Sequence, residues 1–187
     1  MHRLSFPKSS RASRYGLLAS AILLLGASRP AIAAPAPINA QDVNGHQVAV
    51  NGKGHYTLVI YTNPDLEDES RAVTLALDPY RSRQDFTIIR VVDLRGDVPP
   101  EMRGIVRVQI REELAKENKR LKKAGVDVPN QAPIIPDFSG STLDALGWDG
   151  VYDQVHLVVY DPRGHEIKRL ANVSSAAQVT RVVDSIL

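Results

Sequence analysis

Residues 57–69 read TLVIYTNPDLEDE, an apolar run that breaks into an acidic turn. The residues from Leu58 to Tyr61 follow one another without polar alternation, which is typical of a strand covered on both faces, as in a parallel sheet. Asn63-Pro64 ends this strand, and a helix capped by Asn63 or Asp65 should then run to about Asp78. This stretch therefore predicts a junction between a central strand and a helix.

The residues that follow complete a βαβ unit. Phe86–Leu94 (FTIIRVVDL) is β-branched and mostly apolar, so it predicts a second interior strand. Strand, helix and strand within about forty residues are joined by a right-handed crossover. Beyond this unit, Glu101–Ala124 predicts a long, highly charged helix that Gly125 ends. Its apolar stripe is thin and consists of Ile110, Leu114 and Leu121. The spacing within the helix favours two ion pairs, Glu112–Lys116 and Glu117–Arg120.

Turn signals mark a hairpin at each end of the domain. Asn44-Gly45 favours a tight hairpin, because both residues tolerate positive φ. The turn 161–164 (DPRG) joins the predicted strands Val155–Tyr160 and His165–Leu170. Ser175 and Gln178 suggest a capping box that opens a closing helix. These elements predict an α/β fold with a central mixed sheet flanked by helices, an N-terminal hairpin and the charged helix as an insertion.

The first 33 residues have the pattern of a secretory signal peptide. Four basic residues precede the apolar segment Gly16–Ala27, and Ala31-Ile32-Ala33 supplies a small-x-small cleavage site. Twelve apolar residues are too few to span a bilayer, which takes about 20. We therefore expect a signal peptide over 1–33, an extended lead-in over 34–37 and a single domain over 38–187. The mature chain should be exported, periplasmic or secreted, and should lack a membrane span.

Composition excludes several classes of function. Eighteen of the 23 Lys and Arg and all 21 acids lie after residue 33, so the expected mature chain carries a net charge of −3. This balance does not support a nucleic-acid binder. The sequence has no cysteine, which excludes disulfides, thiolate metal sites and a cysteine nucleophile.

Two stretches resemble the thioredoxin-like superfamily. Residues 57–70 (TLVIYTNPDLEDES) look like the strand and nucleophile turn of peroxiredoxins and related secreted thioredoxin-fold proteins. Residues 133–167 look like their distal half, and Asp137-Phe138-Ser139-Gly140 stands at the position where such proteins have a D-x-x-G turn. Among such groups the chain looks most like the YtfJ-type exported proteins. The resemblance covers about 38–187 and implies a thioredoxin-like domain.

Two departures from this pattern remove the redox site. The turn that would hold the active cysteines reads Asp65-Leu66-Glu67-Asp68-Glu69, and the cis-proline that normally faces them is absent near Val155. Thiol–disulfide exchange needs a thiolate attacker. Thiol oxidoreductase and peroxidase activities are therefore excluded, and an ordinary trans peptide is expected near Val155.

The acidic cluster Asp65, Glu67, Asp68 and Glu69 has two interpretations. The carboxylates could bind a divalent cation or act as acid and base. Alternatively they stabilise the positive end of the helix dipole, by about 0.3–1 kcal/mol each. We favour the second interpretation, and we predict no cofactor and no metal.

Other candidate residues lie further along the chain. Arg103, Arg107 and Arg111 fall at i, i+4 and i+8, so they form a positive stripe that could meet an acidic partner or an anionic surface, or could simply be solvated. Trp148 is a core anchor or the floor of a ligand groove. Among the histidines, His156 lies in the strand behind the missing proline.

These observations favour an exported, redox-inactive thioredoxin-fold domain that acts by binding an unknown protein or small ligand. A first alternative is a non-thiol enzyme that uses Asp65–Glu69, with or without a divalent cation. A second alternative is a structural protein of the envelope. The enzyme needs a histidine or a second acid beside the acidic turn in a cleft, whereas the binding protein needs an exposed apolar or aromatic patch.

Overall fold

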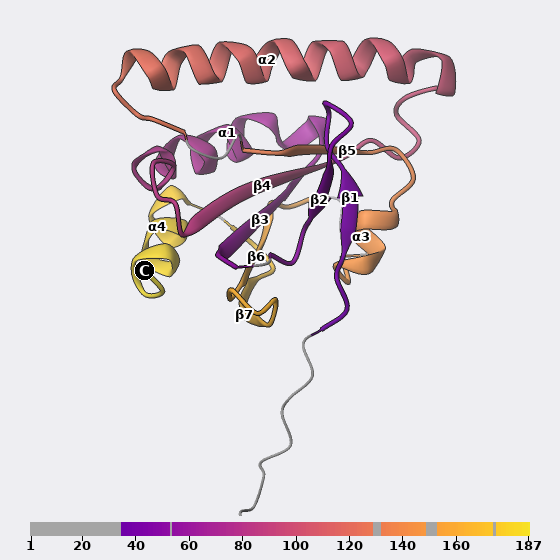
Figure 1. The fold of residues 1–187 in the computed structure, drawn as a ribbon. Coiled ribbons are helices and arrows are strands. Elements are labelled where there is room, and N and C mark those ends of the chain that lie inside the picture. The colour runs from indigo at the N-terminus through magenta and orange to yellow at the C-terminus, as the bar shows by residue number, and fades with distance from the viewer. Residues whose placement is uncertain (1–34, 53, 129–131, 149–152, 174) are drawn as a thin grey trace, which may run out of the picture. The chain divides into compact units, whose positions relative to one another are not determined.

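The strand predicted from residues 57–69 lies at the centre of a five-stranded mixed sheet (Figure 1). The computed structural model describes residues 35–187 except 53, 129–131, 149–152 and 174, so the predicted signal peptide lies outside the described residues. The strand order is β5-β4-β3-β6-β7. In β3 (Tyr56–Thr62) the side chains of Leu58 to Tyr61 are fully buried, as the unbroken apolar run predicts.

The neighbours of β3 confirm the βαβ unit. β4 (Phe86–Asp93) pairs with it in parallel, and β5 (Ile134–Asp137) extends the parallel part of the sheet. On the other side, β6 (His156–Tyr160) and β7 (Glu166–Leu170) are antiparallel. The carboxyl ends of β3, β4 and β5 and the amino end of β6 therefore lie at the same end of the sheet.

Helices α1 and α4 pack against each other beside the sheet (Figure 1). A short 3-10 turn (Pro64–Leu66) leads into α1 (Glu67–Ala76), and the Asn63 side chain accepts a hydrogen bond from Leu66 N at 3.0 Å. Of the two predicted capping residues, Asn63 is therefore the one that caps this turn, directly after β3. α4 (Ala176–Asp184) begins after Ser175 as predicted, but the Ser175 side chain makes no capping hydrogen bond, and its carbonyl accepts from Gln178 N instead.

The N-terminal hairpin and the D-x-x-G turn are both present. β1 (Asn39–Gln41) and β2 (Gln47–Ala49) form a separate antiparallel pair. The Asp137 carboxylate precedes α3 (Ser141–Ala145) and accepts backbone N–H bonds from Gly140, Thr142 and Leu143 at 2.8–3.1 Å. Gly140 has a φ of +82°, and a Cβ there would lie 2.2 Å from Arg95 Cδ, so this turn requires glycine.

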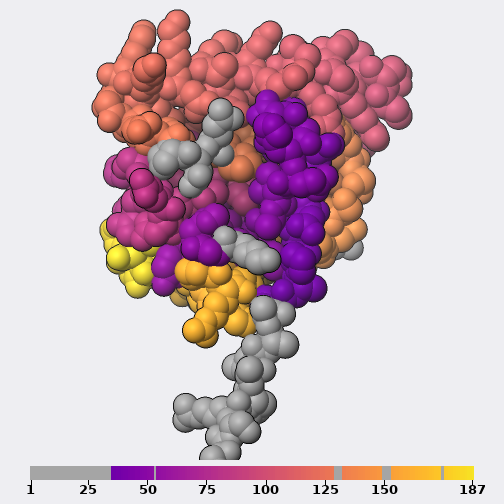
Figure 2. Space-filling model, in the orientation of Figure 1, coloured from indigo at the N-terminus to yellow at the C-terminus, as the bar shows by residue number. Residues whose placement is uncertain are grey.

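The charged helix is α2 (Arg103–Lys123), preceded by a 3-10 turn (Pro100–Met102). Its apolar stripe is as thin as predicted, because only Leu114 and Leu121 are buried. Leu114 packs on Ile134 of β5. In Figure 2 the N-terminal hairpin (indigo) reaches up to α2 (rose), where Arg107 contacts the Asp42 carbonyl.

Within the described ranges, no helix is long and apolar enough to cross a membrane. The same ranges contain no cis peptide bond.

Candidate functional site

The four acidic residues after β3 are exposed: Asp65 lies in the 3-10 turn, and the other three lie in the first turn of α1. They do not converge. Glu69 lines a groove toward the amino end of β6, Glu67 lines a cavity toward α2, and Asp65 and Asp68 line neither. Among the residues that the structure describes, no group of three His, Asp or Glu could hold a metal ion. The arrangement fits carboxylates placed at the positive end of a helix dipole.

The first of these hollows, which we call the junction groove, lies between α1, the residues before β6 and the loop before α4. It has a volume of about 290 Å³. Leu66, Val73, Val155 and Val173 give it apolar walls, and each is largely buried. Glu69 and Asp153, both exposed, also line it. The groove therefore combines apolar walls with carboxylates from two segments far apart in the sequence.

His156 does not enter this groove. Successive side chains of a strand point to opposite faces, so His156 lies across the sheet from Val155. Its ring centroid lies 5.6 Å from that of Tyr61 and 6.0 Å from that of Trp148. The residue is 2% exposed, and neither ring nitrogen has a hydrogen-bond partner among the described residues. Burial lowers the pKa of His156 and Arg169 adds to this effect, while Asp153 opposes it.

Trp148 lies in the core rather than on a groove floor. It is 3% exposed, and its ring packs against the rings of His156 and Tyr61. The Arg169 guanidinium lies 5.4 Å from its ring centroid and donates to the Leu146 carbonyl at 2.9 Å. This placement makes Trp148 a packing residue that a cation covers.

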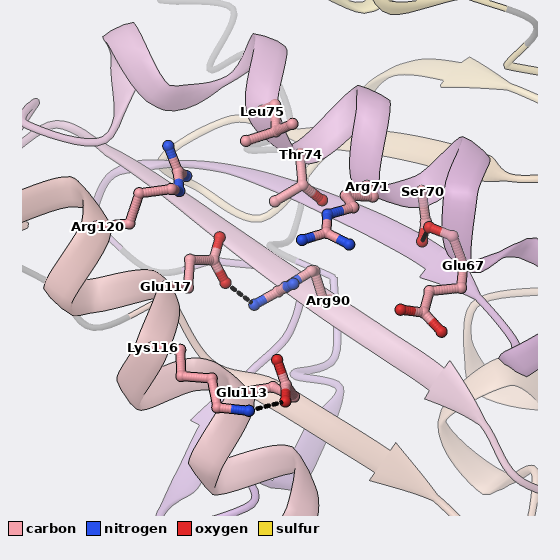
Figure 3. A pocket seen from close by; sticks show the side chains of 10 residues that line it. All are labelled: Glu67, Ser70, Arg71, Thr74, Leu75, Arg90, Glu113, Lys116, Glu117 and Arg120. Carbon is pink, nitrogen blue, oxygen red and sulfur yellow. Dashed lines mark hydrogen bonds and ion pairs between the residues drawn. The ribbon is translucent and has the colours of Figure 1, made fainter. Parts of the chain in front are cut away.

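The second hollow is a cavity of about 440 Å³ between α1, β4 and α2 (Figure 3). Its charges compensate one another across the elements. Glu117 of α2 pairs with Arg90 of β4 and with Arg81, which is 4% exposed. Arg120 pairs with Asp78 at 2.6 Å. We interpret this network as the attachment of α2 to the rest of the domain.

The network also corrects the predicted pairs within α2. The spacing predicted Glu112–Lys116 and Glu117–Arg120 pairs, but Lys116 binds Glu113 at 2.6 Å and Glu117 and Arg120 bind outside the helix. Burial lowers the pKa of Arg81, whereas Glu117 acts in the opposite direction. A buried arginine of this kind requires a carboxylate partner.

The third hollow, which we call the arginine recess, involves two residues of the predicted positive stripe. Arg103 and Arg107 both line it, with Cζ atoms 5.3 and 5.2 Å from the centroid of the Phe138 ring. Arg111 is exposed and does not line the recess. The spacing along α2 predicted the stripe, but nothing in it indicated that Phe138 would lie beneath two of its three members.

Comparisons with known proteins show the fold alone. No family model matches the sequence, and no curated protein matches it. A DsbF homologue from Corynebacterium diphtheriae superposes with a TM-score of 0.54 at 14% identity over 80% of this chain and 84% of its own. StoA from Bacillus subtilis gives 0.52 at 15% over 80% and 97%, and the exposed lipoprotein thioredoxin of Streptococcus pneumoniae gives 0.52 at 16% over 81% and 100%.

The chain therefore has a thioredoxin-like fold, as its sequence resemblance implies, and it has no cysteine. The turn between β3 and α1 carries carboxylates where the resemblance places thiols. Sequence reasoning identified Glu69 as a candidate but missed Asp153, because the two lie close only after β6 has paired with β3.

Proposed function

We propose that the protein is an exported, redox-inactive thioredoxin-fold binding protein that holds a segment of a partner protein in the junction groove. The observation that carries this proposal is the groove itself. It occupies the place where the family resemblance puts the redox pair, between the β3–α1 turn and the residues before β6. Without a thiol, this surface can still bind a polypeptide segment of a partner protein.

The lining of the groove indicates what kind of segment it suits. Burial of an apolar side chain against Leu66, Val73 and Val155 would contribute roughly 25 cal/mol for each Å² removed from water. Glu69 and Asp153 carry negative charge at the same place and favour a lysine or arginine beside that apolar residue. The partner is therefore a segment in which an apolar and a basic residue are neighbours.

The enzyme alternative receives less support from the same geometry. A second acid, Asp153, does lie with Glu69, but His156 points to the other face of the sheet, and the remaining acids of the turn line other surfaces or none. The two carboxylates are better suited to complement a basic side chain than to form the acid–base pair that the enzyme requires.

A peptide selection tests the proposal. A library of random peptides displayed on phage is enriched against the purified protein, and the affinity of the best peptide is then measured by fluorescence anisotropy. We expect selected peptides to place Lys or Arg next to an apolar residue. The double change Glu69→Gln, Asp153→Asn should weaken binding by about tenfold, because it removes charge-assisted contacts.

The acidic turn supplies a matched control. Asp65→Asn, Asp68→Asn also removes two negative charges, both from the turn that carries Glu69 but outside the groove, so it should leave peptide affinity within about twofold. No enrichment, or equal weakening in both double variants, would contradict the proposal. Peptide hydrolysis that depends on added calcium or magnesium would favour the metal-dependent enzyme instead.

A further inference from the structure

The arginine recess lies away from the junction groove and has a different chemistry. Its volume is about 400 Å³, and residues of β1, β2, α2 and β5 line it together with the turn that begins α3. Neutral polar side chains, including Gln41, Gln47 and Ser139, surround the two arginines. This lining suits a polar molecule rather than an apolar chain.

The two guanidinium groups are held in place by Phe138 but keep their donors. A guanidinium that lies over an aromatic ring contacts it through its face, so N–H groups along its edge remain for oxygen acceptors. Among the described residues, Arg103 forms no hydrogen bond and no ion pair, and its Nε is buried. Arg107 forms one long contact, 3.5 Å from Nη1 to the Asp42 carbonyl oxygen. Two cations in one recess thus retain most of their hydrogen-bonding capacity.

The carboxylates near the recess are engaged elsewhere and form no ion pair with the two arginines among the described residues. Asp137 lines the recess, but it is 4% exposed, and both its oxygens accept backbone N–H bonds at the start of α3. Asp42 accepts from the backbone of Asn44 and His46 and pairs with the His46 ring. The recess therefore carries two arginines and one carboxylate, and no ion pair joins that carboxylate to either arginine among the described residues, so a net positive charge remains in a hollow that is lined by hydrogen-bonding groups.

We propose that the arginine recess binds a small molecule that carries an oxyanion, a phosphate or a carboxylate, on a polar body. Arg103 and Arg107 hold the oxyanion through the edges of their guanidinium groups, since planar forks match both kinds of anion. The amides and hydroxyls around them bind the rest of the molecule. This inference does not depend on the proposed binding of a peptide segment in the junction groove.

Isothermal titration with inorganic phosphate and, separately, with malonate tests the proposal and distinguishes the two anions. Both titrations are run at constant ionic strength against chloride, because exposed charges bind any anion weakly and salt screens them. We expect saturable binding of one or both probes with a stoichiometry near one. Arg103→Gln and Arg107→Gln should each weaken it about tenfold, as the loss of one charge-assisted contact implies.

Arg111→Gln is the matched control, because it removes the same charge from the same helix one turn beyond the recess. It should leave the affinity within about twofold. Arg103→Lys keeps the charge but loses the planar fork, and we expect an intermediate loss. Circular dichroism and the melting temperature confirm that each variant is folded.

Three results would overturn the proposal. One is the absence of saturable binding of both probes up to about 10 mM, a concentration at which a site with a Kd of about 1 mM would be about nine-tenths occupied. Another is equal weakening by Arg111→Gln, which would indicate a diffuse surface field. The third is full affinity in the Arg103→Gln, Arg107→Gln double variant.

Discussion

His156 is a titratable side chain buried in an aromatic cluster without a hydrogen-bond partner among the described residues. Burial lowers its pKa, so the folded protein resists protonation of the ring while the unfolded chain accepts a proton near the ordinary value of about 6.5. Above that pH, His156 is neutral in both states and does not lower the free energy of unfolding. As the pH falls below it, the unfolded state binds more protons, and stability declines by up to about 1.4 kcal/mol for each pH unit.

The measurement is urea unfolding between pH 5 and 7.5, a range that begins above the ordinary carboxylate pKa values of about 3.9 and 4.3. His156→Phe removes the titrating group but keeps an aromatic ring beside Tyr61 and Trp148. The decline toward pH 5 should be shallower in this variant than in the wild type by the contribution of one proton. Identical slopes in both proteins would show that His156 does not remain neutral in the fold.

At the scale of elements, α2 depends on its charged contacts more than on its thin apolar stripe. Glu117 is the carboxylate that meets both Arg81 and Arg90, and its side chain is 14% exposed. Glu117→Gln leaves the Arg90 guanidinium without a charged partner among the described residues, and it leaves the buried Arg81 with Asp78 alone, whose carboxylate lies 3.3 Å from Arg81 Nε. We expect this change to cost about 3 kcal/mol of unfolding free energy, as for other broken buried pairs.

Glu113→Gln provides the comparison, since Glu113 binds Lys116 on the same helix at an exposed position. Solvent screens such a pair, so the change should have little effect on stability. Denaturant titrations of the two variants under the same conditions compare their losses of unfolding free energy. A Glu117→Gln variant as stable as Glu113→Gln would mean that water replaces the network without cost.

The same helix shows what could be predicted from the sequence. The predicted helix, Glu101–Ala124, exceeds the observed α2 by two residues at its start, where a 3-10 turn stands, and by one at its end. Helical spacing identified the buried Leu114 and Leu121, whereas Ile110 of the same stripe is only half-buried. The partner of Glu117 could not be found that way, because local spacing favoured Arg120 while the fold supplied Arg81 and Arg90. The same limit applies to Asp153 in the junction groove and to Phe138 beneath the arginines, since both contacts join segments distant in sequence.

At the scale of the whole molecule, a thioredoxin-like fold is present without the group that gives this fold its redox chemistry. The central strand, the βαβ unit and the antiparallel β6–β7 pair are in place. The sequence has no cysteine at any of its 187 positions. The fold therefore supplies a rigid frame for the junction groove and the arginine recess, while activity must come from other side chains.

The final prediction follows from this absence of thiols. Thiol–disulfide exchange and thiol peroxidase chemistry both begin with attack by a thiolate, and no other side chain replaces it. Insulin reduction with dithiothreitol and peroxide consumption should therefore proceed at the rate of the blank. A cysteine-containing thioredoxin in parallel shows that the assays work. Pretreatment with iodoacetamide identifies contaminants, because alkylation inactivates a contaminating thiol enzyme but finds no thiol in this chain. Turnover that survives alkylation and co-purifies with the protein would contradict the prediction.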